Sequence, residues 1–266
     1  MDLVPIYSHL LEPSISSPGA FCIKNTKTTD EEIEALTASA ECIIVESRAP
    51  LSLVTPSVLS AFISIHGPHL QILNLQNSRI SSQELSDLAP SLPNLKVLFL
   101  QYLNAISDGS IMTLVGRCHN LEEIHLSQNR QLTKGLFYFF LGQDRSFSTV
   151  SLDLTLDSDR PDGFESKAKI NKLTLIGRHF VNQDALSFSH RQPDVLELRL
   201  TRVDGRGVSD LLGYCKQGSQ RYKIIVTEMF SVKLMKIADE LQNNNSLNAP
   251  PEYKLTLKDR SLIISS

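Results

Sequence analysis

The chain has 266 residues, of which 26 are basic and 29 acidic, so its net charge is −3 at neutral pH. Apolar residues make up 41% of it, which is enough for a hydrophobic core and argues against a disordered chain. The near balance of charge gives no electrostatic reason to expect binding to nucleic acid or to an anionic membrane. The four cysteines include no C-x-x-C pair and are too few for a disulfide scaffold, so we expect buried thiols in a reducing compartment.

An N-terminal cap is expected at positions 1–19. This segment contains charged residues and prolines but no uninterrupted apolar run, which is unlike a secretory signal. No stretch of the chain reaches the roughly 20 apolar residues that a membrane-spanning helix needs. Ile23 begins a weak first unit, in which Thr28-Thr29-Asp30 predicts the capped start of a helix.

A strand and a helix are predicted next. Ile43 and Val45 have the alternation of inward strand positions, so Ile44 is expected on the opposite face. Residues 55–65 then carry apolar side chains at helical spacing. The separation of Ile43 from Leu73 is larger than that between the later strands, which predicts a long loop between this unit and the next.

Three segments then repeat the pattern L-x-x-L/I-x-L, in which the leucines face a core and the residues between them face outward. Their first leucines are Leu70, Leu95 and Leu121, so the pattern recurs at an almost constant interval. A fixed period in the range of about 20–29 residues with this strand pattern is typical of a leucine-rich repeat. The clearest unit, residues 95–119, ends in a short amphipathic helix that the Ser107-Asp108 pair would cap.

The pattern continues with less regularity toward the C-terminus. An aromatic helix is expected at 137–141, and the mostly polar residues 153–169 predict a solvated insertion between two strands. Helix starts are expected at 181–186 and 208–212, and a longer helix at 230–241. Alternating apolar residues predict further strands at 147–152, 170–175, 195–200 and 222–227, and a closing hairpin of 255–257 with 262–264.

Together these elements predict a single α/β fold, a leucine-rich-repeat horseshoe (solenoid) of about seven to nine repeats. A parallel β-sheet would line its concave face, and short helices would cover its convex face. A solenoid needs caps over the exposed ends of its core. The expected organisation is an N-terminal cap at 1–19, repeats over 20–228 with the insertion at 153–169, and a C-terminal cap at 229–266.

One subtype of this repeat fits the clearest unit. Ile106-Ser107-Asp108 opens its helix and Cys118 closes it. In these positions the chain resembles the cysteine-containing repeats of F-box/leucine-rich-repeat proteins, in which an Ile-Thr-Asp element begins the helix and a cysteine ends it. The resemblance implies an array that recognises protein partners, and the reducing compartment expected from the cysteines would be the cytoplasm. We find no F-box before the first repeat, so the adaptor binding of that family is not carried over.

The expected function is therefore non-enzymatic protein–protein recognition on the concave face. One alternative is a substrate-recognition subunit of a ubiquitin ligase, or a pathogen effector that mimics one and acts in the host cytosol. Another is an enzyme with its site in the 153–169 insertion, for which the sequence supplies no nucleophile–base pair.

Candidate binding residues are the outward-facing side chains of the strands. Phe99 beside His125 is the most informative pair, because an exposed aromatic near the middle of a sheet is typical of a partner hot spot. The alternative is that Phe99 packs against neighbouring strands and binds nothing. Lys172 and Arg199 are expected one row apart, where they would pair with an acidic partner. The predicted protein-binding residues are Phe99, Gln101, Glu123, His125, Lys172, Glu197 and Arg199.

No motif for catalysis, metal binding or a cofactor is found. Residues 157–168 resemble a calcium loop, but they lack its glycine and its final glutamate. His66 and His69 flank Gly67-Pro68, so one helix cannot present both to a metal. H-E-x-x-H, G-x-S-x-G and phosphate-loop patterns are absent, so no metal, cofactor or small-molecule substrate is expected.

Overall fold

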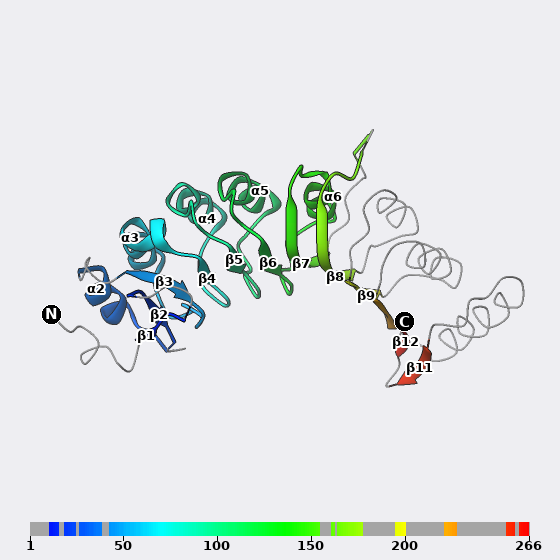
Figure 1. The fold of residues 1–266 in the computed structure, drawn as a ribbon, viewed down its shortest axis with the longest axis horizontal. Coiled ribbons are helices and arrows are strands. Elements are labelled where there is room, and N and C mark those ends of the chain that lie inside the picture. Colours follow the sequence, from blue (N-terminus) through cyan, green and yellow to red (C-terminus); the bar gives the residue numbers. More distant parts are fainter. Residues whose placement is uncertain are drawn as a thin grey trace, which may run out of the picture. The chain divides into compact units, whose positions relative to one another are not determined.

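The computed structural model has an α/β fold with a mostly parallel sheet (Figure 1). Contacts divide the chain into two compact units, residues 1–131 and residues 132–266. The structure describes residues 11–15, 19–24, 27–38, 43–154, 161–162, 164–177, 195–200, 221–227, 254–258 and 261–265.

The strands of the first unit lie in the sheet in the order in which they occur in the sequence. The first pair, β1 and β2, is antiparallel, and the pairs from β2 to β6 are parallel. Parallel neighbours need a crossover connection, which helices provide here. The strands are β1 (Leu11–Pro13), β2 (Phe21–Ile23), β3 (Ile44–Ser47), β4 (Ile72–Asn74), β5 (Val97–Phe99) and β6 (Glu123–Leu126).

The helices of the first unit lie along one side of its strands (Figure 1). The N-cap residues of the last three, Thr55, Ser81 and Ser107, are evenly spaced along the chain. The helices are α2 (Asp30–Ala38), α3 (Pro56–His66), α4 (Ser82–Leu88) and α5 (Asp108–Arg117), with 3-10 turns η1 (Gly67–His69) and η2 (Ala89–Ser91) after α3 and α4. The helices predicted at 55–65 and after Ser107 are thus confirmed.

Helix α4 was not predicted, although its start has a recognisable pattern. The Glu84 amide donates to Ser81 Oγ at 3.3 Å, and the Ser81 amide donates to Glu84 Oε2 at 2.8 Å. This reciprocal pair is the capping box that the sequence S-x-x-E encodes. Ser81 Oγ also donates to Glu84 Oε2 at 2.7 Å, and this hydrogen bond, followed by that of the Ser81 amide, lowers the pKa of the Glu84 carboxyl because both stabilise its charged form.

The predicted inward positions of the clearest repeats are confirmed. Leu73 pairs with Leu98 and Leu98 with Ile124 across the parallel sheet, and all three are fully buried. The leucines that begin these repeats, Leu70, Leu95 and Leu121, are also fully buried. The period of the sequence therefore corresponds to one strand and one helix per repeat, with the same positions facing the core.

The predicted inward position Ile43 of β3 is wrong, although Glu46 keeps its predicted outward place, in the row of Ile72. Ile44 is fully buried, whereas Ile43 is 41% exposed. Ser47 pairs with Leu73, so this step of the sheet has nearly the same length as the following ones, and the expected long loop does not exist. The error arose because the run from Ile43 to Val45 is apolar throughout, so that a period of two cannot fix which face is inward.

The turns after β4, β5 and β6 share a left-handed residue. Asn77, Tyr102 and Gln128 have φ angles of 56°, 61° and 65°. Each lies at the same place beyond the paired row that Asn74, Phe99 and His125 form. Asparagine tolerates this conformation, but tyrosine and glutamine do so at a cost of about 1–2 kcal/mol. Its recurrence at the repeat period indicates that the repeat geometry imposes this turn.

The helix ends share one buried position, which the capping pattern aligns as His66, Leu92 and Cys118. Cys118 is fully buried with its Sγ 4.0 Å from the Ala89 carbonyl oxygen, as expected for a small core residue. His66 is buried beside Phe62, and its Nε2 lies 3.3 Å from the Leu36 carbonyl oxygen. Burial lowers the pKa of His66, so the neutral ring fills a place that leucine and cysteine fill elsewhere.

The second unit has a parallel run of four strands that ends in an antiparallel hairpin, in the order β7-β8-β9-β10-β12-β11. The predicted strands and the predicted closing hairpin are confirmed. The strands are β7 (Ser146–Leu154), β8 (Lys169–Gly177), β9 (Val195–Leu200), β10 (Arg221–Thr227), β11 (Lys254–Lys258) and β12 (Ser261–Ser265). The helical elements predicted at 181–186, 208–212 and 230–241 lie outside the described residues.

Aromatic residues pack around α6 (Gly135–Gly142), the helix predicted at 137–141. Phe140 meets Phe147 edge to face at 5.5 Å between ring centroids. Tyr138 meets Phe164 in the same way at 5.2 Å, and the Lys167 amide donates to the Leu141 carbonyl oxygen. The end of the predicted polar insertion therefore contacts α6 through Phe164 and the backbone at 167–168, while Glu165 and Lys167 are exposed, as expected of a solvated segment.

Candidate functional site

The face of the first unit opposite its helices carries the predicted outward side chains of β4, β5 and β6. We call this surface the strand face. Strand pairing aligns its first two rows as Ile72, Val97 and Glu123, and as Asn74, Phe99 and His125. The third position of each strand lies at or just beyond its end: Gln76, Gln101 and Ser127. The first two predicted rows are confirmed for these three strands.

Phe99 and His125 stack on each other near the centre of the strand face. Their ring centroids are 4.6 Å apart, and the ring planes differ by 8°. Both side chains are half-buried, so the pair remains partly accessible to solvent. Pairing of parallel strands brings the two residues opposite each other, so the stack follows directly from the repeat period. The predicted contact between Phe99 and its neighbour is therefore present.

Charged and polar groups surround this stack. His125 Nε2 lies 3.8 Å from the Glu123 carboxylate on the same strand, a distance at which a protonated ring would be attracted. Gln101 has a buried Oε1 for which no hydrogen-bond partner exists among the described residues. Tyr102, which sequence reasoning missed, is 52% exposed in the left-handed turn beyond β5. Its position just after an outward row of a regular array was the available signal.

Asn74 has a structural task within the second row. Its Nδ2 donates to the Arg48 carbonyl oxygen at 2.7 Å, and its Oδ1 accepts from the Gln76 amide at 3.0 Å. The side chain is buried, so it holds backbone groups of the loop after β3 and of the turn after β4. Such a residue holds the backbone in place and offers little surface of its own.

The N-terminal end of the same sheet carries a partly buried ion pair. Glu46, expected to face outward and be accessible, is buried and pairs with the exposed Arg48. Burial, and next the Glu46 charge, raise the pKa of Cys22 to about 11. Cys22 is thus protonated at neutral pH and is a poor nucleophile. The expected buried thiols are confirmed for Cys22 and Cys118, while Cys42 and Cys215 lie outside the described residues.

The predicted residues of the second unit do not form the expected row. In the sheet Lys172 pairs with Val195, whereas Glu197 pairs with Thr174 and Arg199 with Ile176. Lys172 and Arg199 are therefore separated by two rows, and Glu197 is not beside Lys172. The error arose because Leu196, Leu198 and Leu200 alternate regularly. A shift of the strand by two residues leaves leucines facing inward, so the pattern does not fix the register.

Glu197 instead lies between Thr174 of β8 and Lys223 of β10 in the same row. Lys172 and Lys223 are exposed, and Glu197 is half-buried. This row carries both signs of charge. It does not carry the concentrated positive charge that was expected to attract an acidic partner.

Within the described ranges, no group of three or more histidine, cysteine and acidic side chains is placed to hold a metal ion. The helices described are also too short, or too polar, to cross a membrane. A scan of protein-family models found no family that matches the chain, and a search of curated proteins found no matching relative.

Proposed function

We propose that this chain is a leucine-rich-repeat solenoid that binds a protein partner on its strand face, which would be the concave side of a horseshoe. The repeat assignment is supported by hydrogen bonds that recur between neighbouring units. Asn94 donates to the Pro68 carbonyl oxygen at 2.7 Å, and one repeat later Asn120 donates to the Pro93 carbonyl oxygen at 2.9 Å. Stacked units that bury a continuous core are the defining feature of such arrays.

The buried asparagine of the turn after β6 supports the same assignment. Asn129 donates to the carbonyl oxygens of Leu100 and Leu126 at 2.8 Å and accepts from the Leu103 amide at 2.7 Å. It therefore joins the turns of two successive repeats while satisfying three buried backbone groups. A ladder asparagine after the strand is part of the leucine-rich-repeat pattern.

The observation that carries the binding proposal is the stack of Phe99 on His125. Aromatic side chains at the centre of an interface supply a large apolar area at little entropic cost, and they dominate binding energies. Here two rings are already ordered by strand pairing and stacking, so little conformational freedom is lost on binding. Glu123 and Gln101 would form the polar surroundings that orient a partner.

The proposed role is non-catalytic binding inside the cell. The thiols of Cys22 and Cys118 are buried and form no disulfide, which supports a reducing, cytoplasmic compartment. The protonated state of Cys22 at neutral pH gives no support to a thiolate nucleophile.

Site-directed photo-cross-linking tests this proposal. A benzophenone side chain is placed at Gln101 on the strand face, and in a control chain at Thr113, an exposed residue of α5. In cells that express the chain, we expect a protein adduct from position 101 that is lost when Phe99→Ala is added, and no such adduct from position 113. An adduct that forms equally from both positions, or that persists with Phe99→Ala, contradicts binding on the strand face.

A further inference from the structure

Helix α3 carries an apolar stripe on its solvent side. Ile65 is 43% exposed, and Leu53, just before the helix, is 59% exposed. Ala61 is exposed and Val58 is half-buried between them. The positions 58, 61 and 65 recur at the spacing that brings side chains onto one helix face. Such a surface costs solubility unless it is covered, so it calls for an explanation.

The neighbouring α4 repeat is polar at the same positions. Alignment of the N-caps Thr55 and Ser81 places Glu84 where α3 has Val58. Asp87 of α4 takes the place of Ala61, and Ser91 of η2 takes that of Ile65, while Arg79 corresponds to Leu53. The repeat fold itself therefore does not require apolar residues on this side. The stripe is a property of α3 alone among the aligned helices α3, α4 and α5.

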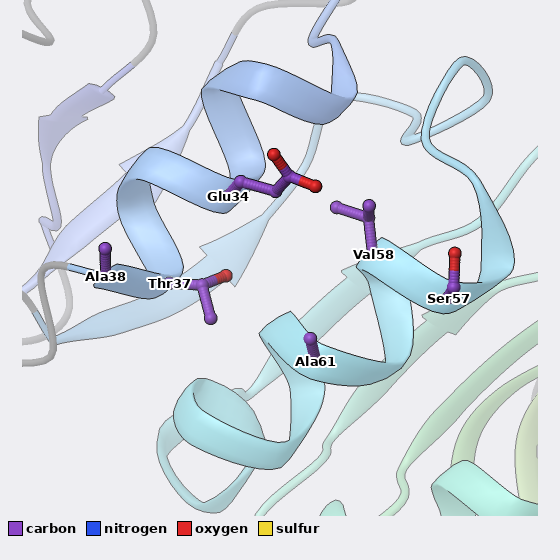
Figure 2. Close-up of a pocket in the computed structure, with 6 residues that line it drawn as sticks. All are labelled: Glu34, Thr37, Ala38, Ser57, Val58 and Ala61. Atoms are coloured by element: carbon purple, nitrogen blue, oxygen red, sulfur yellow. The ribbon is translucent and has the colours of Figure 1, made fainter.

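A groove runs between this stripe and α2. It has a volume of about 440 Å³, and Figure 2 shows its lining residues on the facing sides of the two helices. Most of them are small, so the groove is shallow and can admit larger side chains from outside. The lining residues are Glu34, Thr37 and Ala38 of α2 with Ser57, Val58 and Ala61 of α3.

The α2 side of the groove is acidic. Residues 28–47 contain six acidic residues and no lysine or arginine, and residues 49–65 contain no charged residue. The carboxylate of Asp30 accepts from the Thr55 amide, and that of Glu32 from the Thr29 amide. In the described part of the chain, the side chain of Glu34 has neither a hydrogen bond nor an ion pair, although its backbone belongs to helix α2. Its carboxylate extends over the groove toward Val58 (Figure 2).

We propose that the α2–α3 groove binds an amphipathic, basic helical segment of a partner protein. Apolar side chains of that segment would cover Val58, Ala61 and Ile65, and a lysine or arginine would pair with Glu34. Docking an apolar helix face into such a groove with i, i+3 and i+7 anchors is a common mode of peptide recognition. This site is separate from the strand face, since it lies between helices, and it does not depend on the function proposed there.

The charge of α2 selects this occupant over two others. An anionic membrane surface would be repelled by the acidic residues that flank the stripe. A second copy of this chain would bring the same acidic helix against itself, which is unfavourable for the same reason. A basic segment satisfies both the apolar stripe and the carboxylate of Glu34.

Fluorescence anisotropy tests the site. The labelled peptide is about 14 residues long and carries leucine on one helix face and lysine on the opposite face. The control peptide carries glutamate in place of lysine. The protein variants are Ala61→Asp, which introduces the residue of α4, and Glu34→Lys; Asp87→Ala in α4 is the matched control. Thermal unfolding of each variant checks that it is folded.

We expect the lysine peptide to bind the wild-type chain, and Ala61→Asp and Glu34→Lys each to raise its Kd about tenfold or more. Asp87→Ala should leave the Kd within about twofold, and Phe99→Ala should also leave it unchanged, because the strand face is not involved. Equal binding of the glutamate peptide, or no effect of Ala61→Asp, would overturn the proposal. Self-association of the wild-type chain that Ala61→Asp abolishes would identify a second copy as the occupant and would also overturn it.

Discussion

Two repeats of the first unit, one built on α3 and the other on α5, have the same local geometry and different side chains. At aligned core positions both are apolar: Phe62 corresponds to Leu114 and Ile63 to Val115. On the exposed side Ile65 corresponds to Arg117. Buried positions are thus limited by packing, whereas exposed positions differ freely. The exposed differences are therefore where the function of each repeat is to be sought.

The turns that follow the strands also differ between repeats. The largest expected effect on the free energy of unfolding comes from the turn after β6. Asn129→Ala would leave the carbonyl oxygens of Leu100 and Leu126 and the Leu103 amide without their partner. We expect the free energy of unfolding to fall by about 3 kcal/mol, since each orphaned buried group costs about 1–3 kcal/mol. Urea unfolding measures this loss.

The matched control for this turn is Ser78→Ala. Ser78 is the aligned residue in the turn after β4, and its buried Oγ has no partner in the described part of the chain. Its removal should not lower the free energy of unfolding, because no hydrogen bond is lost and a buried polar atom without a partner is removed. Equal losses for the two variants would mean that Asn129 does not hold the turns together.

The junction between α3 and the next repeat contains a glycine, Gly67, that the junction after α5 lacks. A Cβ on Gly67 would press against the Ser91 carbonyl oxygen and would lie 3.1 Å from Ile63 Cγ2. Gly67→Ala is therefore expected to destabilise the chain by about 1–3 kcal/mol, because backbone must move. Gly116→Ala in α5, where a Cβ meets nothing within 4 Å, should be neutral or stabilising. Thermal unfolding compares the two, and a loss from Gly116→Ala as large as that from Gly67→Ala would refute the close-approach argument.

At the buried helix-end position, the α3 repeat has His66 and the α5 repeat has Cys118. Only the histidine should make the free energy of unfolding depend on pH in the acidic range. The folded chain lowers the pKa of His66 through burial, below the value of 6.5 of a free side chain. As pH falls through 6.5, the unfolded chain binds a proton that the folded chain resists, so this group lowers stability at acidic pH and has no effect well above 6.5. His66→Leu, the residue of the α4 repeat, should reduce the fall in unfolding free energy between about pH 8 and pH 5. An identical fall with and without His66 would exclude this source of acid sensitivity, and Cys118→Leu should leave it unchanged.

The smallest effect on stability is expected on the exposed side. Ala61→Thr and Ile65→Arg introduce the residues of α5 into α3. We expect these substitutions to change the free energy of unfolding by less than about 0.5 kcal/mol, since surface substitutions away from structural contacts are nearly neutral. Calorimetry measures this change. A large loss of stability would mean that the apolar stripe is needed for folding, and not for a partner.

The repeat period predicted much of the fold because it acts on core positions. The leucines at 70, 95 and 121 predicted the strands β4 to β6 and their register, and from that register the contact of Phe99 with His125 follows. The pattern failed where apolar residues were too many to define a face, as around Ile44, and where regular alternation left the register open, as around Leu196. Helix α4 has a signal in the sequence that the leucine pattern does not include, the capping box of Ser81 and Glu84.

The surface properties were less predictable. That Asn74 and Glu46 are buried on an outward row depends on side chains from neighbouring strands and loops, which alternation cannot report. The groove between α2 and α3 depends on the fit of two helices from different repeats. Its residues are ordinary in sequence, and only the alignment of the repeats reveals that the exposed stripe of α3 is exceptional.

The most direct test of the central claim is the affinity of a partner captured by cross-linking from position 101, measured by calorimetry with purified chains. We expect Phe99→Ala to weaken binding by at least about 2 kcal/mol, about thirtyfold in Kd, as for a central aromatic residue of an interface. Thr113→Ala, on the other side of the same repeat, should leave the Kd unchanged. Equal affinities of the Phe99→Ala and wild-type chains would contradict the assignment of the strand face as the binding surface.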